Sequence, residues 1–265
     1  MRLLFGLICL LVSVLVSATG LESQLTPGGL YVGNVPTGGR VFYEDKEVSV
    51  APDGRFIIGF GRDADLDQSY TVLLANGQQR LVLLTLKPRE YDIQRLTGIA
   101  KKYVSPDERV LSRIRSEAEA VKFARMEDTR LYDFFNGFSW PVKGRISGVY
   151  GSQRVYNGKP GRPHYGLDIA VPTGTPVKAP ADGIVRLADN DLYYSGGTII
   201  IDHGYGLFSS FLHLSKVSVR EGSMIKRGER IGDVGATGRV TGAHLDWRYN
   251  WFDKRLDPSL LTVDE

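Results

Sequence analysis

Cysteine is almost absent from this sequence. The only one among the 265 residues is Cys9, inside an apolar stretch near the N-terminus. The rest of the chain therefore has no disulfide and no thiol chemistry, and a metal site there must be built from histidine, aspartate or glutamate. Histidine is also scarce: there are four, and the first is His164. Chemistry that depends on imidazole is thus confined to the second half of the chain.

An excess of charge of one sign is lacking too. The 33 basic and 30 acidic residues leave a formal net charge of +3. Such a weak balance gives no reason to expect nucleic acid as a partner, although it is compatible with an anionic polymer of the cell envelope. The 31 glycines indicate many turns, and therefore short strands rather than long helices.

The N-terminus has the features of an export signal. Arg2 supplies a positive charge, residues 3–16 are almost wholly apolar, and Val16-Ser17-Ala18 offers a site for cleavage. The apolar run is shorter than the roughly 20 residues of a membrane span. We expect residues 1–18 to be a signal peptide and the protein to reach the periplasm or cell envelope. The alternative is an uncleaved anchor, which would be the chain's only contact with a membrane.

Residues 25–96 predict a small β-sandwich that serves as an accessory domain. Short β-rich runs at 30–32, 41–43, 56–58 and 70–74 alternate with glycine-containing turns. Asp53-Gly54 and Asn76-Gly77 are typical of tight hairpins between such runs. This part contains no histidine and no carboxylate cluster with metal-ligand spacing.

A connecting helix is predicted over residues 105–131. Ser105 can cap it, Pro106 suits its first turn, and Glu108 can complete a capping box. Apolar residues then recur at helical spacing, at 110, 111, 114, 118 and 121. From about 138 to 261 strand and turn signals return, which predicts an antiparallel sheet that folds over itself. The fold class is therefore mainly β.

Histidine and aspartate occur at strand spacing in this C-terminal part. In an extended strand, His164, Gly166 and Asp168 would share one face, with open space at the glycine. His244, Asp246 and Arg248 would do the same in a second strand. His213 would stand in a third strand on the face of Phe211. A catalytic zinc ion takes three such ligands and leaves a fourth position for water. The remaining histidines could then transfer a proton or stabilise an oxyanion.

The motifs of residues 138–261 resemble those of the lysostaphin-type, LytM-like zinc endopeptidases, which act on the cell wall. The similarity lies in His164-x-Gly-x-Asp168, Asp202-His203-Gly204, Phe211-Leu212-His213-Leu214 and Gly242-Ala243-His244-Leu245-Asp246-Trp247, in this order. It implies a barrel-sandwich-like sheet, a Zn²⁺ cofactor and the stem peptides of peptidoglycan as substrate. Other cell-wall enzymes are conceivable partners.

The resemblance also implies roles for individual residues. His164 and Asp168 match the first two zinc ligands, and His213 and His244 match catalytic histidines. Position 246 corresponds to the third ligand, where the family usually has histidine and this chain has Asp246. A carboxylate can bind zinc, so we expect activity with an altered site.

Three further residues are weaker candidates for binding substrate. Arg154 and Asn157 lie just before His164, and Arg248 shares the face of Asp246 or pairs with it. His203, in a predicted turn, is interpreted as structural.

Two other classes remain open from the sequence. One is a metal-free module of the same family that binds the wall or regulates a cell-wall amidase. The other is a lipoyl- or biotinyl-type carrier domain, which would need a modified Lys226; the residues around it lack the usual pattern, and an export signal fits poorly.

Overall fold

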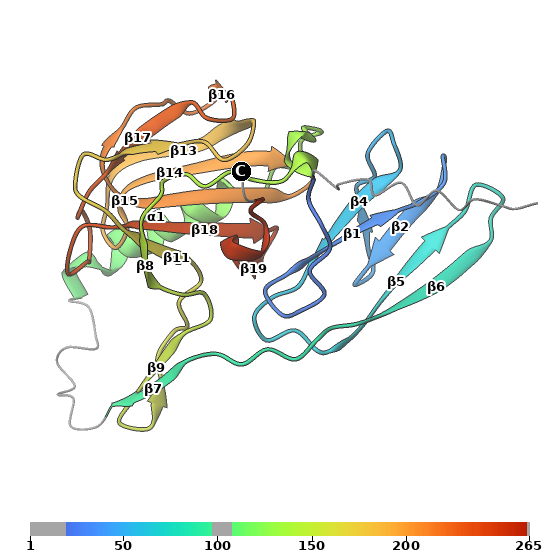
Figure 1. The fold of residues 1–265 in the computed structure, drawn as a ribbon, viewed down its shortest axis with the longest axis horizontal. Coiled ribbons are helices and arrows are strands. Elements are labelled where there is room, and N and C mark those ends of the chain that lie inside the picture. The colour runs from blue at the N-terminus through green and yellow to red at the C-terminus, as the bar shows by residue number, and fades with distance from the viewer. Residues whose placement is uncertain (1–19, 97–107, 264–265) are drawn as a thin grey trace, which may run out of the picture.

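The computed structural model describes residues 20–96 and 108–263, so the predicted signal segment and the predicted cap at Ser105 lie outside the described residues. The protein is mainly β, as predicted, with a pair of small sheets in its N-terminal part and a large antiparallel sheet in its C-terminal part (Figure 1). No helix among the described residues is long and apolar enough to cross a membrane.

The N-terminal part holds two small sheets. β1 (Leu30–Asn34) pairs with β4 (Arg55–Gly59), while β2 (Arg40–Tyr43), β3 (Lys46–Val48), β5 (Asp67–Leu73) and β6 (Gln79–Thr85) form a sheet in the order β3-β2-β5-β6. Phe56 of β4 and Tyr70 of β5 bring the two sheets together, with ring centroids 5.4 Å apart.

One of the two predicted hairpins is confirmed. Asn76-Gly77 closes the hairpin between β5 and β6. The predicted hairpin at Asp53-Gly54 is wrong. These residues form a turn between β3 and β4, but the two strands do not pair with each other: β3 pairs with β2, and β4 pairs with β1. A local turn signal specifies the change of direction but not the partner, because the partner depends on packing between sheets.

A strand from the N-terminal part also pairs with the C-terminal part. β7 (Ile93–Leu96) runs parallel to β9 (Gln153–Tyr156), which forms a hairpin with β10 (Lys159–Pro160). This small sheet stands apart from the two larger bodies in Figure 1. The β9–β10 hairpin directly precedes His164 in the sequence, and residues of β7 and β9 line the same groove as His164, His213 and His244.

The connecting helix is shorter than predicted. A 3₁₀ turn over Glu108–Val110 leads into α1 (Leu111–Phe123), which ends at Ala124 instead of near Leu131. The apolar spacing that predicted the helix stops at Val121, and residues 126–132 are irregular. The helix runs behind the large sheet in Figure 1, and Val121 packs against a small apolar cluster that includes Leu192 and Ile200.

The large sheet has the strand order β16-β13-β14-β15-β18-β11-β8, with β12 and β17 paired to each other beside β15 and β19 paired to β18. Its strands are β8 (Arg145–Gly148), β11 (Leu167–Ala170), β12 (Pro176–Lys178), β13 (Gly183–Leu192), β14 (Gly196–Gly204), β15 (Leu207–Val217), β16 (Met224–Ile225), β17 (Arg230–Val234), β18 (Leu245–Trp251) and β19 (Lys254–Leu256). Short 3₁₀ turns occur at Asp133–Asn136 and Pro258–Leu260.

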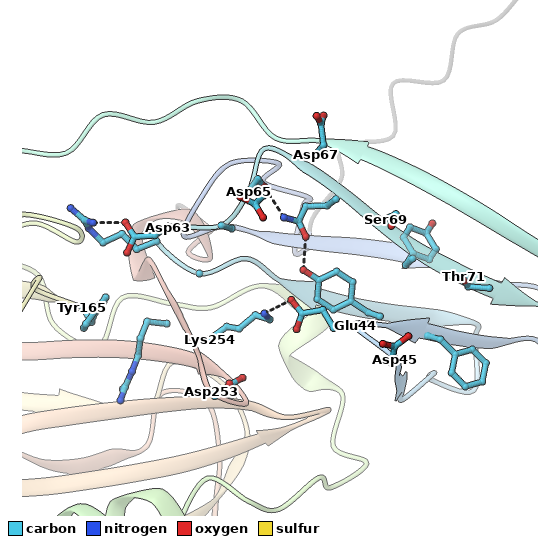
Figure 2. A pocket seen from close by; sticks show the side chains of 18 residues that line it. Glu44, Asp45, Asp63, Asp65, Asp67, Ser69, Thr71, Tyr165, Asp253 and Lys254 are labelled. Carbon is cyan, nitrogen blue, oxygen red and sulfur yellow. Dashed lines mark hydrogen bonds and ion pairs between the residues drawn. The ribbon is translucent and has the colours of Figure 1, made fainter.

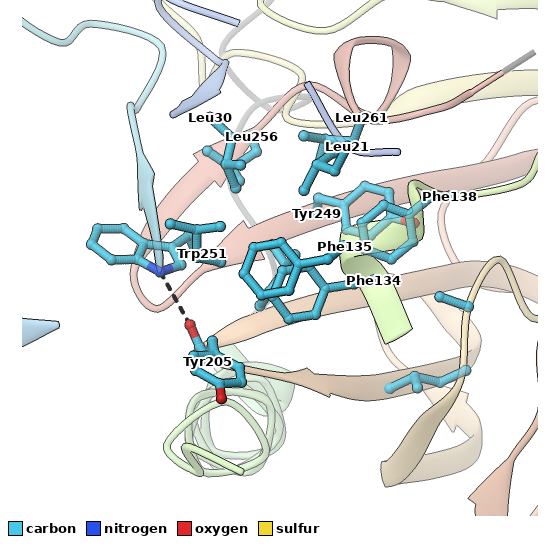
Figure 3. Packing of buried hydrophobic residues seen from close by; sticks show 14 of the residues in the cluster. Leu21, Leu30, Phe134, Phe135, Phe138, Tyr205, Tyr249, Trp251, Leu256 and Leu261 are labelled. Atoms are coloured by element: carbon cyan, nitrogen blue, oxygen red, sulfur yellow. Dashed lines mark hydrogen bonds between the residues drawn. The ribbon is translucent and has the colours of Figure 1, made fainter. Parts of the chain in front are cut away.

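Buried side chains of both parts pack into one core (Figure 3), and Tyr43 of β2 lies against Trp251 of β18 with ring centroids 5.9 Å apart. Phe134 and Phe135 stack with centroids 4.4 Å apart, and Phe138 packs on Tyr249 at 4.6 Å. The indole N–H of Trp251 donates to the carbonyl of Tyr205 at 3.2 Å. Tyr249 and Trp251 thus anchor one face of β18 in the core, and Asp246 and Arg248 lie on its other face.

A polar pocket of about 680 Å³ lies where the two parts meet (Figure 2). Lys254 on β19 and Glu44 beside β2 form an ion pair of 2.7 Å across it. The pocket is rich in carboxylates but contains no histidine among its lining residues.

Candidate metal centre

Adjacent strands bring the predicted ligands together. Asp168 on β11 stands opposite Asp246 on β18. Both side chains lie on the outward face of the sheet, which is the face that bears the groove described below. The prediction that His164 lies in a strand is wrong. β11 begins only at Leu167, so His164 lies in the loop before it. The loop before β11 nevertheless directs the imidazole back to the carboxylate, with Nε2 of His164 3.1 Å from Oδ1 of Asp168.

The potential metal-ligand atoms of three residues lie close together without hydrogen bonds between them. His164, Asp168 and Asp246 each offer an atom within 4.8 Å of the others. His164 Nε2 and Asp168 Oδ1 are buried and face each other at 3.1 Å, but neither makes a hydrogen bond among the described residues. Buried polar atoms of this kind are rare unless something else binds them. One imidazole and two carboxylates are a donor set that zinc accepts, so the site fits the metal.

Two glycines make room for this cluster. A methyl group at Gly166 would collide with Asp246 Oδ1 and lie 2.8 Å from Cγ of Arg248. A methyl group at Gly148, which pairs with Asp168 across β8 and β11, would meet the carboxylate of Asp168. Both positions are therefore restricted to glycine by the approach of the ligands.

His213 reaches the site through a break in β15. Its backbone has φ of 66°, a left-handed conformation that non-glycine residues rarely adopt. The pairing of β14 with β15 shifts between Gly197 and Ile199 at this point, as in a β-bulge. The expected alternation is therefore wrong here: Phe211 lies in the core, whereas Leu212 and His213 both line the groove that holds the site.

The two candidate catalytic histidines are held in the same tautomer. Nδ1 of His213 donates to the carbonyl of Thr237 at 2.9 Å, and Nδ1 of His244 donates to the carbonyl of Gly242 at 2.9 Å. Because a carbonyl only accepts, each Nε2 is left with a lone pair when the ring is neutral. These Nε2 atoms lie 3.9 Å from Asp246 and 3.8 Å from Asp168, and the two rings are 4.9 Å apart.

Asp246 is already paired with Arg248. Nε of Arg248 donates to Oδ1 at 2.8 Å, and Nη2 donates to Oδ2. Burial alone would raise the pKa of Asp246, but the guanidinium of Arg248, with help from His164 and His213, holds it below the ordinary value. The carboxylate therefore stays ionised at neutral pH, with both oxygens engaged.

The neighbouring histidines differ in their affinity for a proton. Burial disfavours charge on His164, yet the contact with Asp168 and the charge of Asp246 raise its pKa above the ordinary value. For His213 burial prevails over the attraction of Asp246 and lowers the pKa. His213 is therefore neutral at pH 7 and able to accept a proton.

The cluster opens into a groove of about 1220 Å³ along the outward face of the sheet. Ile114, Ala118 and Val121 of α1 line one side of it, and Arg154 of β9 lines another. Arg248 also faces the groove. Asn157, the other weak candidate, is not among the described residues that line it and lies in the turn between β9 and β10 with φ of 49°.

His203 makes structural contacts, as expected, but it lies within β14 and not in the predicted turn, which follows at Tyr205-Gly206. It is fully buried, Nδ1 contacts the carbonyl of Asp182 at 2.8 Å, and Nε2 contacts Ser209 Oγ at 2.7 Å. Its ring packs edge-on against Phe138.

Several residues that shape the site were not among the predicted site residues. Thr237 orients His213 through its carbonyl, and its hydroxyl bridges β14 and β15 by contacts to Gly197 and Leu214. Arg125, which follows α1, reaches the groove from a distant part of the chain. The glycine-flanked position of Thr237 was a usable signal, whereas nothing in the local sequence distinguishes Arg125 from other helix-terminal cations.

Known proteins are similar to this chain in sequence. The model of peptidase family M23 matches residues 162–258. The peptidoglycan DD-endopeptidase ShyA of Vibrio cholerae is 34% identical over 227 residues, which cover 74% of this chain and 48% of ShyA. The DD-carboxypeptidase/endopeptidase Mpg of Neisseria meningitidis is 38% identical over 123 residues, or 46% of this chain and 28% of Mpg. This chain thus spans about half the length, or less, of these curated relatives.

A solved structure extends the similarity to nearly the whole fold. A crystal structure of a peptidase M23 from Pseudomonas aeruginosa superposes with a TM-score of 0.70 at 30% identity, covering 90% of this chain and 94% of that one. The match includes the N-terminal sheets as well as the large sheet that carries Asp168 and Asp246. On this evidence the resemblance seen in the sequence motifs is confirmed, and the chain belongs to peptidase family M23.

Proposed function

We propose that this protein is an exported, zinc-dependent endopeptidase that hydrolyses the peptide cross-links of peptidoglycan in the cell envelope. The observation that carries the proposal is the convergence of His164, Asp168 and Asp246 on one point, where two buried ligand atoms make no hydrogen bond. The substrate class is supported by ShyA, a peptidoglycan DD-endopeptidase, and by Mpg, a DD-carboxypeptidase/endopeptidase.

His164, Asp168 and Asp246 would hold the ion. Zinc supplies Lewis-acid activation of water and of the peptide carbonyl when it is bound. His213 is suited to take up a proton at Nε2, because its Nδ1 is fixed by Thr237 and its pKa is lowered by burial. His244 presents its Nε2 from the other side and, once protonated, can donate to the developing oxyanion or to the leaving amine.

The groove around the site suits an extended peptide. It is lined by α1 on one side and by the β7–β9–β10 sheet on another, with Arg154 and Arg248 available for polar contacts. We assign the catalytic chemistry to the region 138–261 and an accessory role to residues 25–96. Binding of other cell-wall enzymes would involve surfaces outside this groove.

Metal analysis and digestion of purified cross-linked peptidoglycan test the proposal. We expect about one zinc ion per chain and release of uncrosslinked muropeptides, both abolished in His164→Ala and Asp168→Asn. Asp45→Asn is a matched control, because Asp45 is exposed and its φ of 60° suits asparagine. Failure to bind zinc after reconstitution would refute the enzyme.

One observation favours a second candidate, a metal-free module that binds the wall or regulates a cell-wall amidase. Arg248 occupies both oxygens of Asp246 and brings a positive charge to the place of the third ligand. Under this alternative the protein binds peptidoglycan without zinc, and neither the unchanged protein nor Arg248→Gln hydrolyses it.

A further inference from the structure

Several arginines gather in the groove beside the candidate metal centre. Arg125 follows α1, Arg162 precedes His164, Arg248 lies on β18 and Arg255 lies on β19; all of them line the groove. They come from four separate segments of the chain. The charges of Arg255, Arg248 and Arg162 add to the effect of burial and lower the pKa of Arg125 well below the ordinary value.

This cluster lacks the carboxylates that would normally accompany it. Arg248 pairs with Asp246, but among the described residues no carboxylate forms an ion pair with Arg125, Arg162 or Arg255. Arg125 instead donates from Nη2 to the hydroxyl of Ser210 at 2.8 Å. Its Nε is buried with no partner.

Arg255 is placed in a similar way. Its Nη1 donates to the side-chain oxygen of Asn250 at 3.0 Å. Burial, together with the charges of Arg248 and Arg162, lowers its pKa to about 10. Neutral acceptors therefore position both guanidinium groups and leave their charges uncompensated.

An arrangement of this kind costs stability. Buried cations are destabilising unless they are paired, and like charges close together add to the cost. A guanidinium with free N–H groups is also well shaped to bind a carboxylate through two hydrogen bonds. The missing partner is thus an anion that arrives with a ligand.

We propose that Arg125 and Arg255, with Arg162 at the rim, form a subsite for a carboxylate of the peptide substrate. This inference rests on the proposed function for the identity of the ligand. Arg248 stands opposite Ser210 and Asp246 stands opposite Leu212 on the same face of β15 and β18. One step along that face is about 7 Å, so the bound carboxylate lies about two residues of extended peptide from the bond that is cut.

Peptide binding measured without hydrolysis tests the subsite separately from catalysis. The probe is a fluorescent cross-linked muropeptide with free carboxylates, compared with the same peptide after conversion of its carboxylates to carboxamides. Binding is followed by anisotropy with a chelator present. We expect the protein to bind the acid about tenfold more tightly than the amide or better, which is the effect of one charge-assisted hydrogen bond.

Arg125→Gln and Arg255→Gln should each reduce this preference, while binding of the amide stays within about twofold. Arg220→Gln, at an exposed position in the loop after β15, is the matched control and should retain the full preference. Thermal melts check that the variants fold.

The outcomes separate the two proposals. Equal affinity for acid and amide, or a preference that persists in both variants, overturns the subsite even if the enzyme is active. Absence of hydrolysis in zinc-loaded protein overturns the proposed function, while a carboxylate preference that depends on Arg125 would still establish the subsite.

Discussion

Replacing Arg248 with glutamine should strengthen zinc binding. In the structure both oxygens of Asp246 accept hydrogen bonds from this guanidinium, and the carboxylate is almost fully buried. A ligand oxygen shared with a metal ion must loosen at least one of these bonds. A hydrogen bond between charged groups contributes about 1.5–3 kcal/mol. Its loss on metal binding corresponds to a dissociation constant about tenfold higher, or more.

The test is a competition titration of metal-free protein against a fluorescent zinc chelator, without substrate. Arg248→Gln removes the competing donor and the positive charge, so the Kd for zinc should fall by about tenfold or more. Arg125→Gln is the matched control: it removes a nearby positive charge but leaves the Asp246–Arg248 pair intact, so a smaller change is expected.

An opposite result is equally informative. Groups that hydrogen-bond to metal ligands often orient them, and their loss typically weakens metal binding by about 10- to 100-fold. If the Kd of Arg248→Gln rises, Arg248 supports Asp246 as a ligand, and the argument from competition is wrong.

Three further predictions follow from the geometry. Gly166→Ala should weaken zinc binding by about tenfold or more because the new methyl group displaces Asp246, whereas Gly61→Ala, with nothing within 4 Å, should bind zinc normally in the same titration. His213→Gln should keep its zinc but lower kcat by about a hundred- to ten-thousandfold, measured on cross-linked muropeptides; an unchanged kcat would exclude His213 as the base. Burial lowers the pKa of His203 to about 4 from 6.5, so between these values the unfolded chain binds a proton that the folded chain does not. The contribution of His203 to the free energy of unfolding should therefore fall by about 1.4 kcal/mol per pH unit as the pH drops through this window. In urea melts, the free energy of unfolding of His203→Gln should depend less steeply on pH than that of the unchanged protein. An equal pH dependence would contradict the lowered pKa of His203.

The fold class and the residues of the candidate site could be predicted because both depend on local signals. Short β-rich runs separated by glycine specify strands, and four histidines in one half of the chain point to one region. The motif spacing then identified His164 and Asp168 correctly as neighbours, although the geometric reason was wrong. The two meet because a loop turns back before β11, and not because they share a strand.

What the sequence could not provide was the outcome of competition between distant segments. The bulge at His213 is set by the pairing of β14 with β15, so the alternation rule failed there. The pairing of β4 with β1, and not with β3, is decided by the packing of whole sheets. Arg125 enters the groove only because α1 lies against the outward face of the large sheet. None of these relations has a signature in its own neighbourhood of the chain.

The shared aromatic core has a consequence for dissecting the protein. Phe134 and Phe135 are 0% and 2% exposed, and they precede the region that carries the family motifs. A chain shortened to begin at Phe138 would lose this pair, the wall formed by α1 and the β7 strand that completes the edge of β9. Activity lost or gained on such trimming would therefore report a damaged scaffold as readily as a released active site. Point substitutions on the surface of α1 that faces the groove are the sounder way to ask whether the preceding segments restrain the enzyme.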